Sequence, residues 1–87
     1  MAWVYVLRGS SGRHYIGSTI ELARRLDQHW SGQTHTTKRL GADLEVVGTL
    51  ELSTIEEARA LEREMKQKKN PSLALYLLQQ RGGQISR

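Results

Sequence analysis

The chain has 87 residues, which is enough for one small domain with a modest hydrophobic core. It contains no cysteine, which excludes a disulfide scaffold, a thiolate nucleophile and any cysteine-based metal site. The apolar start of the chain ends at Arg8, so it is too short for a signal peptide or a membrane-spanning helix. We therefore expect a globular, cytoplasmic protein that does not bind membranes.

Basic residues are concentrated in two parts of the chain. Residues 1–42 carry six Lys and Arg against two Asp and Glu, and residues 62–87 again carry six against two. Residues 43–61 carry one basic and five acidic residues. If the two basic parts meet in space, they favour a polyanionic partner such as nucleic acid. The alternative is ordinary surface charge that only contacts solvent.

The N-terminal residues predict a β-hairpin followed by a helix. Residues 3–7 are β-branched, aromatic or leucine, which is typical of a strand buried on both faces. Glycine and serine at positions 9–12 indicate a turn, and residues 14–17 predict a second strand. Ser18 or Thr19 can cap the helix that follows. Its apolar residues at helical spacing are Leu22, Ala23, Leu26 and Trp30.

The rest of the chain predicts a loop, a strand and two helices. Residues 31–43 are polar and flanked by glycine, as in a loop. In residues 44–51, apolar residues alternate with more polar ones, as in a strand with one face more exposed to water. A helix is expected to begin after Ser53 or Thr54. Asn70 and Pro71 interrupt that helix and begin another.

This order, ββαβαα, predicts an α+β fold in which helices flank a small three-stranded antiparallel sheet. We expect residues 1–81 to form a single domain. Residues 82–87 are expected to form a short polar C-terminal tail.

Several side chains in this arrangement are suited to phosphate chemistry. Arg25 and His29 are four residues apart and therefore project from the same face of the predicted helix. Arginine can bind a phosphate with two hydrogen bonds, and histidine can move a proton. Taken alone, however, both residues are more simply interpreted as exposed polar residues on a surface helix. The aromatic residues of the strands and helices are most simply interpreted as packing: Trp3, Tyr5, Tyr15, Trp30 and Tyr76.

Glu62 lies next to the apolar stripe of its predicted helix, and a carboxylate there needs a partner. Lys66 and Arg59 are correctly spaced for a helical salt bridge. The other interpretation is a Mg²⁺ ion, which keeps most of its waters and often takes only one or two carboxylates. No cluster of His, Asp and Glu in the sequence has the spacing of a zinc site.

Together these residues resemble the GIY-YIG nuclease family. The similarity covers roughly residues 2–78. It includes the Trp-Val-Tyr of residues 3–5, the Tyr-Ile-Gly of residues 15–17, the block of residues 57–62 and, further on, Pro71. The sequence is most similar to small stand-alone members related to the incision domain of the bacterial excision-repair nuclease.

The resemblance implies roles for individual residues. Five of them would be catalytic: Tyr5, Tyr15, Arg25, His29 and Glu62. Glu62 would bind one Mg²⁺ or Mn²⁺ ion, and Arg25 would stabilise charge on the scissile phosphate. Either tyrosine could accept a proton from the attacking water, and we favour Tyr15 slightly because Arg25 follows it closely in the sequence.

Two departures from the family pattern are visible. Trp3 occupies the position of the first-motif glycine, which changes the packing beside Tyr5. Many larger members place an asparagine a few residues after the matching proline, but here no asparagine follows Pro71 and Asn70 precedes it. Metal affinity or turnover is expected to be weaker as a result.

The implied function is a metal-dependent endonuclease that acts on DNA rather than RNA, in repair or recombination. A separate targeting protein is a further partner that this function would allow. It would recognise structure rather than sequence, because phosphate contacts carry little sequence information. The expected contacts to the nucleic-acid backbone are Arg24, Lys38, Arg39, Lys66, Lys68 and Lys69. One alternative is a non-catalytic nucleic-acid-binding module with the same fold. A protein-docking domain would leave the basic parts unexplained.

Overall fold

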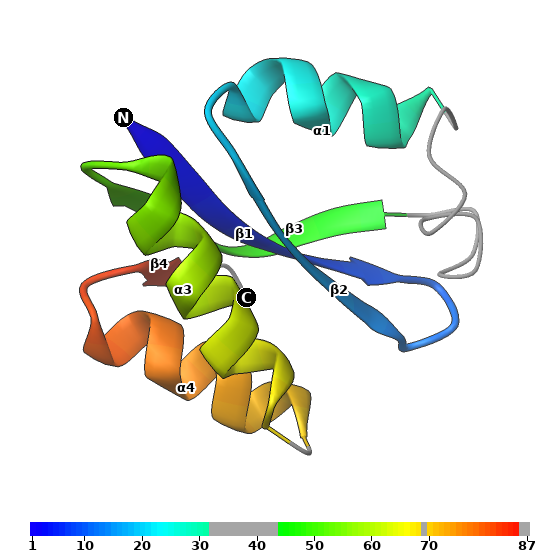
Figure 1. Ribbon diagram of the computed structural model, residues 1–87. Coiled ribbons are helices and arrows are strands. Elements are labelled where there is room, and N and C mark those ends of the chain that lie inside the picture. Colours follow the sequence, from blue (N-terminus) through cyan, green and yellow to red (C-terminus); the bar gives the residue numbers. More distant parts are fainter. Residues whose placement is uncertain (32–43, 69, 86–87) are drawn as a thin grey trace.

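The structure, a computed structural model, describes residues 1–31, 44–68 and 70–85. It consists of one antiparallel sheet with helices on both faces (Figure 1). The strands lie in the order β2–β1–β3–β4, so β2 is an edge strand. They are β1 (Ala2–Gly9), β2 (His14–Thr19), β3 (Leu44–Leu52) and β4 (Gln84–Ile85). The helices are α1 (Leu22–Trp30), α3 (Ile55–Lys66) and α4 (Pro71–Gln80).

The predicted α+β class and the order ββαβαα are confirmed. The sheet, however, has four strands instead of three. The additional strand comes from the segment predicted as a polar tail, where Gln84 and Ile85 pair with Thr49 and Gly48 of β3. None of the helices in the described parts of the chain is both long and apolar enough to cross a membrane.

The starts of α3 and α4 follow the capping signals in the sequence. The side chain of Thr54 accepts a hydrogen bond from the backbone N–H of Glu57 at 3.2 Å. In the same way, the Asn70 side chain accepts one from the N–H of Ser72 at 2.7 Å, and Pro71 occupies the first turn of α4. Such caps satisfy backbone donors that have no partner inside the helix.

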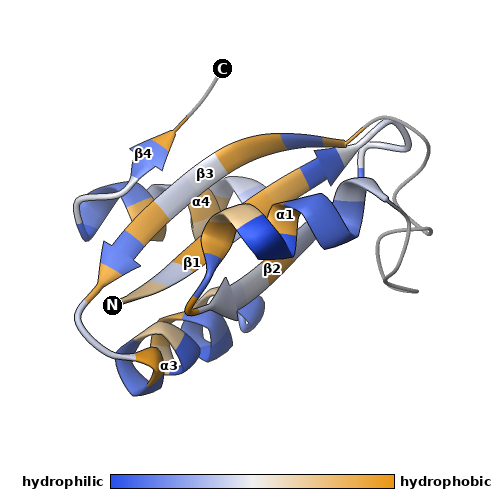
Figure 2. Cartoon of the chain, turned by 90° about the horizontal axis from the view of Figure 1, so that it is seen from above, coloured by the Kyte–Doolittle hydropathy of each residue, from blue (hydrophilic) through white to orange (hydrophobic). Residues whose placement is uncertain are grey.

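The two faces of the sheet are covered by different helices. Figure 2 shows α1 over one face of β1 and β2, while α3 and α4 lie behind the sheet. Because side chains alternate along a strand, Val4 and Val6 of β1 pack toward α3 and α4, and Tyr5 and Leu7 pack toward α1. The larger apolar core lies on the α3 and α4 face. The α1 face is therefore the smaller and more polar of the two.

The orientation of α1 differs from the prediction. Leu22 and Leu26 pack against the sheet as expected, but Ala23 is exposed and Trp30 is 49% exposed. The buried residue of the last turn is His29, which is only 2% exposed. Positions 22, 26 and 29 also share one helical face, so the helix turns its histidine to the sheet instead of its tryptophan. The prediction that Trp30 packs in the core is wrong.

Tyr76 is also not a core residue, since it is 61% exposed. The buried residues of α4 are Ala74 and Leu78, four positions apart, and Tyr76 lies midway between them on the helix. Its ring therefore projects away from the sheet.

Candidate active site

The α1 face carries a hydrogen-bonded cluster built from β1, β2 and α1. The Tyr5 hydroxyl oxygen lies 2.8 Å from Nε2 of His29, and Nε of Arg25 donates a hydrogen bond to the same oxygen at 3.4 Å. The ring of Tyr15 lies against the rings of His29 and Tyr5, with centroid separations of 5.1 Å and 6.1 Å. Four of the five predicted catalytic residues are thus brought together.

Gly17 makes room for this cluster. It is paired with Tyr5 across β1 and β2, and a Cβ atom at Gly17 would lie 2.5 Å from the Tyr5 hydroxyl oxygen. Real Cβ atoms do not approach other atoms so closely, so any other residue would displace the tyrosine. The glycine of the Tyr-Ile-Gly motif is therefore a packing requirement for the position of Tyr5.

Burial sets the protonation states of the cluster. Desolvation raises the pKa of Tyr5 to about 12, although the hydrogen bond from Arg25 opposes this shift. Desolvation, together with the nearby charge of Arg25, lowers the pKa of His29 to about 4. At neutral pH, Tyr5 is therefore a protonated donor and His29 is a neutral acceptor, which matches the short distance between them.

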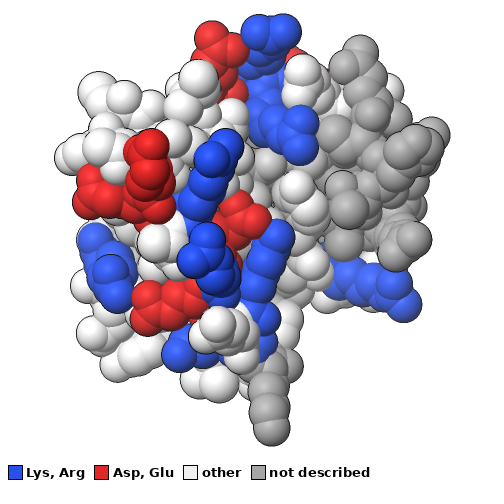
Figure 3. Space-filling view, in the orientation of Figure 1, with Lys and Arg blue, Asp and Glu red and all other residues white. Residues whose placement is uncertain are grey.

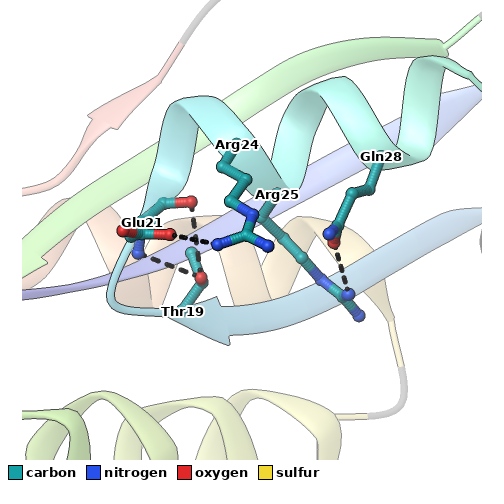
Figure 4. Close-up of polar contacts among 5 residues, drawn as sticks. All are labelled: Thr19, Glu21, Arg24, Arg25 and Gln28. Atoms are coloured by element: carbon teal, nitrogen blue, oxygen red, sulfur yellow. Dashed lines mark hydrogen bonds and ion pairs between the residues drawn. The ribbon is translucent and has the colours of Figure 1, made fainter.

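Arg25 is held as a permanent cation at the edge of this cluster. Its Nη1 atom donates to Oε1 of Gln28 at 3.0 Å, and the hydrogen bond to the Tyr5 hydroxyl raises its pKa further. Figure 4 shows the Arg25 side chain extended from α1 toward β2, with Gln28 beside its guanidinium. Gln28 was not expected from the sequence, although it lies on the same helical face as Arg25.

Glu62, the fifth predicted residue, reaches β2 from the other side. The Ser18 hydroxyl donates to Oε1 of Glu62 at 2.5 Å, and the Lys66 ammonium lies 2.6 Å from Oε2. Ser18 is paired with Val4, so it points to the α3 face, whereas Tyr15 and Gly17 point to the α1 face. Glu62 and Arg25 therefore flank the same edge strand from opposite faces of the sheet.

A groove with a volume of ≈ 450 Å³ passes around the end of β2. Its walls come from α1 and α3, and its floor comes from the end of β2. Polar residues that line it are Ser18, Thr19, Glu21, Arg24, Arg25, Gln28 and Arg59. Glu62 does not line this groove, but it is hydrogen-bonded to Ser18, which does.

Comparisons with known proteins identify the family of this chain. The sequence profile of the GIY-YIG catalytic domain matches residues 1–76. The chain belongs to the GIY-YIG family.

Two similar relatives within this family are UPF0213 proteins of Streptococcus pneumoniae, from serotype 4 strain TIGR4 and from strain R6. Each is 33% identical to the chain over 76 residues, which are 87% of this chain and 77% of the relative. The solution NMR structure of the UPF0213 protein of Bacillus halodurans is 28% identical in sequence and superimposes with a TM-score of 0.57. That similarity covers 94% of this chain and 88% of the other.

Glu62 is the residue of this GIY-YIG domain that could hold a hydrated divalent cation, once Lys66 has left its Oε2 atom. The Glu62 side chain is 20% exposed and has a hydroxyl oxygen, that of Ser18, beside it. The described residues contain no group of three or more His, Cys, Asp and Glu that could enclose a metal. A single carboxylate suits Mg²⁺ or Mn²⁺ ions that retain water and bind substrate phosphate, and does not suit a dehydrated site.

The predicted nucleic-acid contacts of this GIY-YIG domain have different surroundings. Arg24 is ion-paired with Glu21 at 3.3 Å, and Lys66 with Glu62. Lys68 lines a second pocket, next to Lys66. Lys38, Arg39 and Lys69 lie outside the described residues. Figure 3 shows basic side chains over both α1 and α3 on one face of the molecule, with acidic ones among them.

Asn70 has a structural role. Its side chain caps α4, and this cap is the hydrogen bond to Ser72 described above. It therefore does not replace the asparagine that many larger family members carry after the proline.

Proposed function

We propose that this GIY-YIG domain is a metal-dependent endonuclease that hydrolyses phosphodiester bonds in DNA. The main support is the groove around the end of β2, which joins the Tyr5–His29–Arg25 cluster to the carboxylate of Glu62 through Ser18. A phosphate in this groove would have Arg25 on one side and, on the other, Ser18, which is hydrogen-bonded to the carboxylate of Glu62.

Arg25 would stabilise the charge that develops on the phosphate. Hydrogen bonds to Tyr5 and Gln28 fix its guanidinium before substrate binds. A preorganised cation of this kind needs no reorganisation during the reaction, and this lowers the barrier. Removing a comparable transition-state donor typically costs about 10²–10³-fold in rate.

The two tyrosines would have different tasks because their burial differs. Tyr5 is fully buried and its pKa is about 12, so it holds His29 and Arg25 in place and acts as a positioning residue. Tyr15 is partly exposed at the edge of the cluster and is the tyrosine that would contact the attacking water. His29, whose pKa is lowered to about 4, is a weak base at pH 7, so it would act as a neutral acceptor that fixes the Tyr5 hydroxyl.

Glu62 would hold the Mg²⁺ or Mn²⁺ ion, with the Ser18 hydroxyl beside it. When bound, such an ion supplies positive charge that stabilises the scissile phosphate and the departing oxygen. Lys66 would have to leave Oε2 of Glu62 before the ion binds there. Because Lys66 is 53% exposed, it can swing into solvent or toward a substrate phosphate.

Apart from the Glu21 carboxylate, which is paired with Arg24, the described groove presents guanidinium, amide and hydroxyl groups, which contact phosphates rather than base edges. We therefore propose that the enzyme selects branched or flapped DNA by structure, as in repair or recombination, and works in the cytoplasm.

The competing function is a non-catalytic nucleic-acid-binding module. One observation favours it: Lys66 neutralises the carboxylate that the metal needs. A labelled flapped DNA, incubated with and without Mg²⁺, separates the two functions. Endonuclease activity predicts Mg²⁺-dependent nicking that is lost in Arg25→Gln and Glu62→Gln. Binding without nicking at any Mg²⁺ or Mn²⁺ concentration would identify the module.

A further inference from the structure

The groove around the end of β2 contains three arginines with different surroundings. Arg24 is neutralised by its ion pair with Glu21. Arg25 donates to Tyr5 and Gln28 and belongs to the cluster already described. Arg59, from the first half of α3, makes no hydrogen bond or ion pair with any other described residue.

The lack of a partner for Arg59 is unexpected from its position in α3. Glu56 and Glu62 are three residues before and after it, a spacing at which helical ion pairs form. Glu62 is instead held by Ser18 and Lys66, and Glu56 forms no ion pair within the described parts of the chain. The charge of Arg59 is therefore left exposed to the groove.

Arg25 and Arg59 lie on opposite walls of this groove. Arg25 comes from α1, Arg59 comes from α3, and Ser18 and Thr19 at the end of β2 lie between them. Neither arginine is neutralised by a carboxylate within the described residues. Two uncompensated guanidiniums across one polar groove are the pattern expected for a chain of phosphates, because arginine binds phosphate with two parallel hydrogen bonds.

We infer that Arg59 is a phosphate-binding residue of this groove. One nucleic-acid strand crosses the end of β2, with the scissile phosphate beside Arg25 and a neighbouring phosphate at Arg59. This inference rests on the proposed function. It assigns a contact with the nucleic-acid backbone to Arg59, which the charge pattern of the sequence does not distinguish from the other basic residues. Arg24 and Lys66, chosen from the sequence, are each occupied by a carboxylate.

The test compares two arginines of α3. Arg59→Gln and Arg63→Gln remove the same charge from the same helix, and Arg63 is also exposed and unpaired among the described residues but does not line the groove. Binding of a fluorescent flapped DNA is measured by polarisation over a range of salt concentrations in EDTA, where the metal-dependent reaction does not proceed.

Arg59→Gln is expected to weaken binding about tenfold at low salt and to reduce the slope of log K against log salt concentration by about one. Arg63→Gln should leave both values near those of the wild-type protein, and Arg59→Lys should restore the slope. Equal effects of Arg59→Gln and Arg63→Gln would overturn the inference, as would wild-type protein that does not bind this DNA.

The same preparation separates this inference from the proposed function. If the wild-type protein binds the flapped DNA but never nicks it with Mg²⁺ or Mn²⁺, the endonuclease proposal fails, whereas a specific effect of Arg59→Gln still places the strand in the groove. If the wild-type protein nicks the DNA and Arg59→Gln binds it normally, the endonuclease proposal is retained and the assignment of Arg59 is wrong.

Discussion

The face of the sheet that carries α3 and α4 differs from the face that carries α1 in what fills it. On the former, the buried residues are all apolar: Ala2, Val4, Val6, Val47, Leu50, Ala58, Leu61, Met65, Ala74 and Leu78. On the latter, the buried cluster among the described residues consists of Tyr5 and Leu7, and α1 adds the buried imidazole of His29. Apolar burial stabilises the fold, whereas the α1 face uses hydrogen bonds that fix the direction of polar side chains.

This difference suggests a division of labour between the two faces. Substitutions inside the α3 and α4 face should act on stability, because removed methylene groups leave cavities. Substitution of Arg25 on the α1 face should act on chemistry, because Arg25 is the residue of that cluster that lines the groove at the edge of β2. The following predictions test this division.

The largest effect on stability is expected at Met65, which is fully buried between α3 and the sheet. Met65→Ala should lower the free energy of unfolding by about 2–5 kcal/mol, measured by urea denaturation. Leu73→Ala is the control, since Leu73 is 51% exposed. A loss at Met65 below that of a typical surface substitution would contradict the assignment of the main core.

Arg25→Gln should have the opposite profile. Nicking of flapped DNA should fall about 10²–10³-fold, because the transition state loses a fixed cation. The free energy of unfolding should change little, since the guanidinium lies at the edge of the groove and fills no apolar core. Unfolded Arg25→Gln protein would show that the cluster also holds the fold together.

The pH dependence of stability should reveal His29. Its pKa is lowered to about 4 in the folded protein from the ordinary value of 6.5, so the unfolded chain binds a proton first as the pH falls. Stability should therefore be complete above pH 6.5 and decrease between pH 6.5 and pH 4, by roughly 2–3 kcal/mol.

Urea denaturation of wild-type protein and His29→Gln at both ends of this window measures the contribution of His29. His14, whose pKa burial also lowers, is present in both proteins, so their difference isolates His29. Parallel pH profiles would mean that His29 is not buried as a neutral ring.

The smallest effect concerns Lys66. Lys66→Met removes the ammonium from Oε2 of Glu62 and should raise Mn²⁺ affinity about 2–5-fold, as expected for the loss of a competing pair of about 0.5–1 kcal/mol. Calorimetric titration with Mn²⁺ measures it, and Lys68→Met is the control. Weaker Mn²⁺ binding by Lys66→Met would mean that the lysine supports the ion instead of competing with it.

Much of the fold could be predicted because its signals are local. Thr54 and Asn70 cap α3 and α4 as their sequence contexts indicate, and the apolar stripe of α3 is buried as predicted. The β4 strand could not be predicted, because two residues show no periodicity. The orientation of α1 was ambiguous because Trp30 and His29 are both compatible with a stripe through Leu22 and Leu26.

The site could be predicted only in part, because only its sequence motifs are local signals. The motif residues are recognisable in sequence, but their partners depend on the fold: Ser18 and Glu62 are 44 positions apart. Charge alone pointed to Arg24 and Lys66, because it cannot show which cations already have a carboxylate beside them. Arg59 becomes a candidate only when α3 is placed beside β2.

The central claim is that Glu62 and Arg25, although on opposite faces of the sheet, act on one metal-bound phosphate around the edge of β2. Paramagnetic broadening by Mn²⁺ of the NMR signals of the ¹⁵N-labelled protein, with non-cleavable DNA bound, tests it directly. We expect the Nε–H of Arg25 and the amides of Ser18 and Thr19 to broaden together, and this broadening to disappear in Glu62→Gln. Broadening that stays on α3 and leaves Arg25 sharp would contradict a shared site.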